Sequence, residues 1–146
     1  MPDQESPALN LGGPYSPAAT LYAAERVAEV IRYLNHATMH HEALGDPSEA
    51  YRLLRDVILA VQRLPQLLVQ DVRWVEAEHA AGRILVTGGE WEGNPGAAVL
   101  DLAARRDDAA GKAQALWVAL ESVAALLCDM AALEPEDNVD LRWQRL

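Results

Sequence analysis

The chain has 146 residues, of which 51% are hydrophobic and 5% aromatic, with no phenylalanine. This length fits one domain that buries its own core without disulfides or metals. Because alanine is abundant and aromatic residues are scarce, we expect an all-α fold. The net charge of -10 argues against direct nucleic-acid binding, since such proteins carry a basic patch. An acidic nucleic-acid mimic that regulates a DNA-binding partner stays open as an alternative.

The first fifteen residues contain three prolines and a Gly12-Gly13 pair, which predicts a flexible arm over 1–15. This segment lacks the apolar run of a signal peptide. Cys128 is the single cysteine, so no internal disulfide can form. The most apolar window, near 113–133, contains Glu121 and Asp129, which argues against a membrane span. We therefore expect a cytoplasmic protein that does not contact membranes.

The first helix is predicted over 17–41, with Ser16 as its N-cap and Pro17 in its first position. His36 and His40 are four residues apart, a spacing found in two-histidine metal sites. A metal-binding helical bundle that uses His36 and His40 is therefore a second alternative. We favour a simpler interpretation, in which His40 and His41 lie in the last turn and interact with the helix C-terminus.

The second helix is predicted over 47–82, where Asp46 is the N-cap and Pro47 takes the first position. Apolar residues recur at steps of three and four without a change of phase, although Pro65 interrupts the run. Proline removes one helical hydrogen bond and clashes with the preceding turn. We expect one helix kinked at Pro65, while two helices that meet there would make four helices in all.

The third helix is predicted over 95–133, after an Asn94-Pro95 start signal. Its apolar residues follow a near-heptad pattern, which in the second half of the helix consists of Ala113, Leu116, Leu120, Val123, Leu127 and Met130. Because its second half carries the larger side chains, we expect that half to be the more deeply buried. The three helices form an antiparallel bundle domain over 16–134, followed by a polar tail over 135–146.

The predicted lengths of the three helices differ, at about 37, 54 and 58 Å for a rise of 1.5 Å per residue. The shorter first helix covers only part of the other two, which leaves apolar residues exposed at the opposite end. Exposed apolar patches and tryptophans are typical of interfaces. We expect a contact surface for a homodimer or another protein partner at Trp74, Ile84, Leu85 and Trp91. Alternatively, the arm folds over this end through Leu9, Leu11 and Tyr15.

No motif in the chain points to catalysis. A glycine-rich phosphate loop, zinc-ribbon spacing and a Ser-His-Asp order are all missing from the sequence. We therefore expect a non-enzymatic protein–protein interaction module, with no catalytic residues, no resident metal and no cofactor.

The stretches AAERVAEVIRYLNHA (23–37) and YRLLRDVILAVQRLPQLLVQDVRWVEAEHAAGR (51–83) carry most of the helical pattern. In this pattern the chain resembles small all-helical bacterial proteins of GC-rich actinobacteria, which often occur on mobile elements. The resemblance implies a helical fold. It implies no activity, and no functional residue follows from it.

Overall fold

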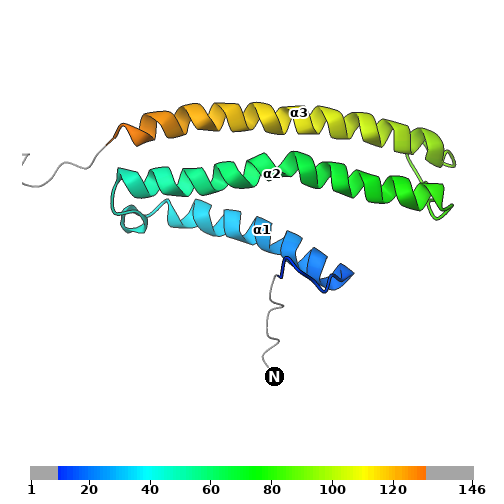
Figure 1. The fold of residues 1–146 in the computed structure, drawn as a ribbon, viewed down its shortest axis with the longest axis horizontal. Helices are drawn as coiled ribbons and strands as arrows, with labels where there is room; N and C mark the ends of the chain where they lie inside the picture. The colour runs from blue at the N-terminus through cyan, green and yellow to red at the C-terminus, as the bar shows by residue number, and fades with distance from the viewer. Residues whose placement is uncertain (1–9, 131–146) are drawn as a thin grey trace, which may run out of the picture. The chain divides into compact units, whose positions relative to one another are not determined.

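The computed structural model describes residues 10–130, and the regular elements in this range are all helices (Figure 1). They are α1 (Pro17–Ala37), the short 3-10 helix η1 (His41–Ala43), α2 (Pro47–Ala80) and α3 (Pro95–Cys128). The expected all-α fold is confirmed. The chain divides into two compact units, Met1–Gly45 and Asp46–Leu146. The predicted boundaries of the arm, the bundle domain and the tail stay predictions.

The first unit contains α1, which begins as expected and ends earlier than expected. The Ser16 hydroxyl accepts a hydrogen bond from the backbone N–H of Ala19, which caps the first turn. At the other end, the Thr38 hydroxyl donates to the Leu34 carbonyl, and the N–H groups of the next two residues bond to carbonyls only three positions back. This tightening ends the helix at Ala37 and not at residue 41.

The earlier helix end corrects the interpretation of the histidines. The histidine in the last turn of α1 is His36. His40 and His41 lie beyond that helix, at the N-cap and the first position of η1. The proposed interaction of His40 and His41 with the end of the first helix is therefore wrong.

The second unit begins with α2, whose start is capped as predicted. One carboxylate oxygen of Asp46 accepts hydrogen bonds from the N–H groups of Ser48 and Glu49, at 2.7 and 3.1 Å. Pro47 occupies the first turn, where its missing N–H removes no helical bond. Pro65 lies inside α2, which continues past it as one helix. The alternative of two separate helices that meet at Pro65 is therefore wrong.

The connection from α2 to α3 is a compact loop without a strand. Gly82 follows the end of α2 with a positive φ of 71°, a conformation that glycine adopts more easily than other residues. The Arg83 guanidinium donates to both carboxylate oxygens of Glu78, at 2.7 and 2.6 Å. The Asn94 side chain then caps α3 by accepting from the N–H of Ala97. This loop turns the chain back so that α3 can pack on α2.

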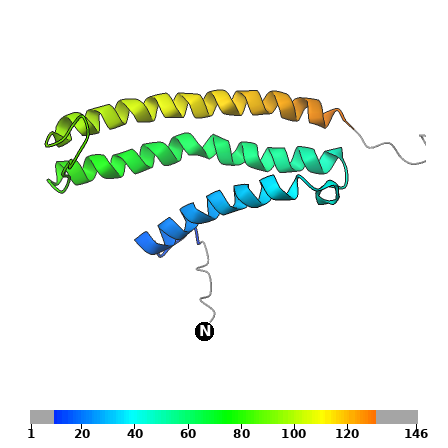
Figure 2. The same ribbon diagram turned by 180° about the vertical axis from the view of Figure 1, so that it is seen from behind.

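Within the second unit, α2 and α3 lie antiparallel along their whole length, as both views show (Figures 1 and 2). Among the described residues the buried apolar side chains are few: Ile58, Val61, Val72 and Ala124. Val72 is 4% exposed, because it belongs to the row of α2 that contains Val61 and Ile58. This core is small for two helices of 34 residues each.

The end of α3 also differs from the prediction. The helix ends at Cys128, because the N–H groups of Asp129 and Met130 bond to carbonyls three residues back. Cys128 itself is exposed. Residues 131–146 lie outside the described part of the chain, so the predicted tail stays a prediction.

Candidate interaction surface

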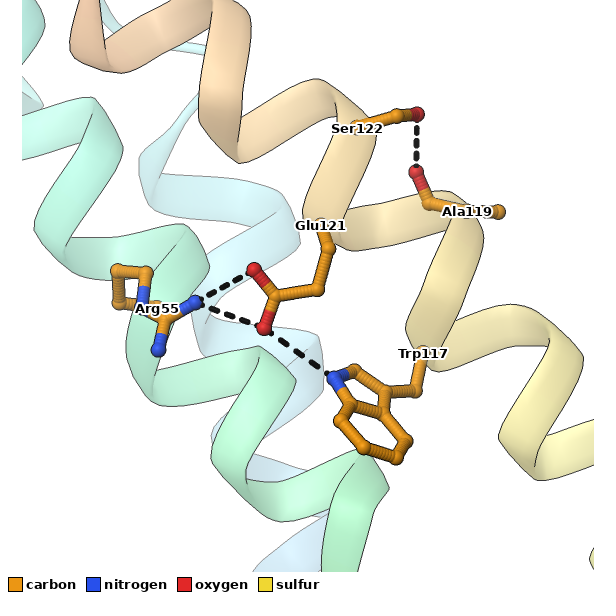
Figure 3. A network of polar contacts seen from close by, with 5 residues as sticks. All are labelled: Arg55, Trp117, Ala119, Glu121 and Ser122. Atoms are coloured by element: carbon orange, nitrogen blue, oxygen red, sulfur yellow. Dashed lines mark hydrogen bonds and ion pairs between the residues drawn. The ribbon is translucent and has the colours of Figure 1, made fainter.

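A polar cluster joins the two long helices. Nη1 of Arg55 on α2 contacts both carboxylate oxygens of Glu121 on α3, at 2.8 and 2.7 Å (Figure 3). The indole Nε1 of Trp117 donates to the same carboxylate at 3.2 Å. These hydrogen bonds, from Trp117 first and then from Arg55, hold the pKa of Glu121 below its ordinary value. The cluster is compatible with only one rotation of α3 against α2, the one that turns Trp117 and Glu121 toward α2.

This rotation gives the second half of α3 an inner apolar row. The row is spaced at alternating steps of four and three residues, and its members are buried or half-buried. Trp117, which belongs to it, points toward α2 in Figure 3. The inner row consists of Ala113, Trp117, Leu120, Ala124 and Leu127.

A second apolar row runs along the same half of α3, and its members are exposed. It alternates steps of three and four residues, the spacing of a coiled-coil seam. Ala119, which belongs to it, lies on the side of α3 away from Arg55 and α2 (Figure 3). We call this row the outer α3 stripe; it consists of Leu116, Ala119, Val123, Leu126 and Met130.

The exposure of the outer α3 stripe overturns one expectation. Leu126 is 62% exposed, and Leu116, Val123 and Met130 are each close to half exposed. We predicted that the second half of this helix is deeply buried, with Leu116, Val123 and Met130 in the packed row. That assignment is wrong for these three residues, because Trp117 and Ala124 pack in their place. It is right for Ala113, Leu120 and Leu127, which belong to the inner row. The sequence shows two overlapping apolar rows and does not say which one faces α2.

The four predicted contact residues fall into two groups. Trp74 on α2 is 63% exposed and Leu85 in the loop is 76% exposed, whereas Ile84 and Trp91 are half-buried. Leu67 lies two turns before Trp74, on the same face of α2, and is also exposed. Trp74 and Leu85 therefore present apolar surface to the surroundings.

Trp91 has a structural contact of its own. Its indole Nε1 donates to a carboxylate oxygen of Asp101 on α3, at 3.0 Å. Arg105, one turn later, binds the same oxygen at 2.7 Å. The hydrogen bonds from Arg105 first and then Trp91 hold the pKa of Asp101 below its ordinary value. Trp91 thus ties the loop to the start of α3.

His36 and His40 are the two candidate metal ligands. The rings of His36 and His40 pack edge to face with their centroids 5.3 Å apart. Within residues 10–130, no group of three or more His, Cys, Asp or Glu side chains is arranged to hold a metal ion. Two imidazoles without a third ligand do not complete a zinc or iron site.

The apolar character of α3 also bears on membranes. By length and composition alone α3 could cross a membrane, yet only 6% of its most apolar window is buried. Core helices of soluble proteins pass the same test of length and composition, but they are mostly buried. Most of the apolar window of α3 is therefore exposed in the described part of the chain.

Comparison of the chain with protein-family models, curated proteins and solved structures found no match. The resemblance to helical actinobacterial proteins stays a prediction.

Proposed function

We propose that this protein is a non-enzymatic helical module that associates with itself. The observation that carries this proposal is the exposed outer α3 stripe, an apolar row with coiled-coil spacing. Single proteins rarely leave a large contiguous apolar surface in water, because covering that surface is favourable by roughly 25 cal/mol per Å².

The small core of the second unit supports the same proposal. Two antiparallel helices that bury so few side chains need further apolar contacts to reach ordinary stability. A second copy supplies such contacts without any change of fold. The stability of the folded chain is then coupled to its concentration.

The contact surface predicted from the sequence remains part of the proposal. Trp74 and Leu85 are exposed and suited to act as apolar anchors, with Ile84 beside Leu85 in the chain. The half-buried Trp91 shapes the loop that carries Ile84 and Leu85. Self-association thus has two candidate surfaces, one around Trp74 and Leu85 and one on the outer α3 stripe.

The expected location is the cytoplasm of a bacterium. Cys128 is exposed, and a reducing compartment keeps such a thiol from forming intermolecular disulfides.

Sedimentation velocity tests the proposal. The full chain, with reductant present, is measured from about 1 to 200 µM, a range that covers weak to moderate dimers. We expect a dimer or a larger species whose fraction rises with concentration. A chain that stays monomeric up to 200 µM contradicts self-association.

A further inference from the structure

We infer that the outer α3 stripe packs against the outer α3 stripe of a second copy, with the two α3 helices antiparallel. This inference rests on the proposed self-association and adds its surface, its direction and its register. From Leu116 to Met130 the stripe extends about 21 Å, at 1.5 Å per residue. A contact of this size lies at the lower end of stable interfaces, so we expect a dimer with a Kd in the micromolar range.

Heptad spacing determines the register. In an antiparallel pair, Leu116 faces Leu126 of the second copy, and Ala119 faces Val123 of the second copy. A two-fold axis then passes close to residue 121, and each of these facing pairs occurs once on either side of it. Since Ala119 and Val123 are smaller than the leucines, the backbones approach most closely near the axis and the leucines fill the wider layers.

Charges at the two ends of the stripe favour this direction. Lys112 lies one turn before Leu116. Its side chain is 77% exposed, and its Nζ binds Asp108 of the same helix at 2.6 Å. Asp129 lies beside Met130 at the other end and is exposed. An antiparallel pair brings Lys112 of each copy next to Asp129 of the other, so both ends join opposite charges.

A parallel pair fits these residues poorly. It sets Lys112 against Lys112 and Asp129 against Asp129, and it stacks Ala119 on Ala119, which leaves a gap in the middle layer. Like charges that face each other across an interface weaken binding. The charge pattern and the packing therefore favour the same antiparallel direction.

Two variants of equal exposure test the surface. Leu126 belongs to the stripe and Val118 lies outside it, on another face of α3, and both are 62% exposed. Leu126→Asp places a charge in the proposed contact, and we expect sedimentation velocity to show a dimer at least about a hundredfold weaker. Val118→Asp should leave the Kd within about twofold. An equal effect of both variants, or no effect of Leu126→Asp, overturns the inference.

Charge reversal tests the ends. Lys112→Glu and Asp129→Lys each turn both end contacts into repulsions, and we expect each variant to dimerise roughly tenfold more weakly. An equimolar mixture of the two variants should recover the affinity of the wild type, because both end contacts again join opposite charges. If neither single variant weakens the dimer, the inferred register is wrong.

Disulfide trapping tests the direction. The background is Cys128→Ser, with one new cysteine per variant. In the antiparallel register Ser122 lies next to Ser122 of the second copy, whereas the two copies of Ala115 are about 20 Å apart along the axis. Mild oxidation should therefore link Ser122→Cys and not Ala115→Cys. Equal linkage of both variants indicates a parallel pair and overturns the inference.

The outcomes separate this inference from the proposed function. A dimer that survives Leu126→Asp but is lost in Trp74→Asp keeps self-association and rejects the stripe as its surface. A wild-type monomer at all concentrations rejects both. The remaining alternative is that the stripe binds a membrane. Flotation with vesicles of phosphatidylcholine and phosphatidylglycerol (3:1) tests it. Wild-type flotation that Leu126→Asp abolishes, without a dimer in solution, assigns the stripe to a membrane and overturns the inference.

Discussion

Arg55 and Glu121 are 66 positions apart in the chain, yet Nη1 of Arg55 contacts both oxygens of the Glu121 carboxylate. The ion pair is partly exposed, with about a third of each side chain accessible. Its main consequence is geometric, because it holds α3 in the rotation that turns the outer α3 stripe away from α2. Stability and surface therefore depend on the same contact.

This contact predicts a pH effect. The pKa of Glu121 is lowered from an ordinary value of 4.5, by Trp117 first and then by Arg55. A carboxyl group whose pKa is lower in the folded chain stabilises the fold above its unfolded pKa. That stabilisation is lost as the pH falls through the folded pKa. We expect Glu121→Gln to unfold more easily than the wild type at pH 7, and we expect this difference to narrow as the pH falls below 4.5.

Urea denaturation followed by circular dichroism, at pH 7, 5 and 3 for both chains, checks this expectation. The comparison isolates Glu121, since the other carboxylates titrate alike in both chains. If the gap between the two chains is the same at pH 3 and pH 7, the ionised carboxylate does not provide the stabilisation.

Ile58 is the most completely buried side chain among the described residues, with no exposed surface. Ile58→Ala leaves a cavity between packed side chains and should lower the free energy of unfolding by about 2–5 kcal/mol. Leu59, the next residue, is 40% exposed and serves as the control. Leu59→Ala should cost clearly less in the same urea titration. Equal losses would mean that Ile58 is not at the centre of the core.

Gly82 ends α2 with a φ of 71°, and a Cβ placed on it would meet no atom within 4 Å. The cost of Gly82→Ala is therefore conformational, about 1–2 kcal/mol for an L-residue in the left-handed region. Gly88 in the same loop also has open space around it, but its φ is not in that region. Gly88→Ala should be neutral or slightly stabilising. Thermal denaturation compares the two variants, and similar melting temperatures would contradict this explanation.

The sequence predicted the starts of the helices well, because those starts depend on local signals. Ser16, Asp46 and Asn94 each cap the helix they were expected to cap. The ends were less accurate: α1 and α3 stop four and five residues before the predicted ends, at Ala37 and Cys128. Both close in turns with bonds to carbonyls three residues back. No glycine marks these ends as Gly82 marks the end of α2.

The rotation of α3 was beyond sequence reasoning for a different reason. Trp117 and Leu116 are neighbours, and either could lead a heptad row through the second half of the helix. The choice depends on contacts between α2 and α3, such as that of Glu121 with Arg55, a residue far away in the chain. Helical periodicity reports how apolar residues are spaced, and a tertiary contact decides which row packs. The outer α3 stripe was missed for this reason.

Pro65 lies inside α2, where its ring has no N–H to offer the carbonyl of Val61. Pro65→Ala restores that donor and should raise the free energy of unfolding by about 1–3 kcal/mol. The gain is smaller than the full cost of proline in an ideal helix, because α2 already accommodates the ring. Pro47→Ala is the matched control. It increases the conformational freedom of the unfolded chain to a similar extent as Pro65→Ala. However, Pro47 occupies the first turn, where no helical hydrogen bond is missing. Urea denaturation should therefore show a gain for Pro65→Ala and none for Pro47→Ala. If Pro65→Ala is less stable than the wild type, the packing of α2 on α3 depends on the shape that the proline gives the helix.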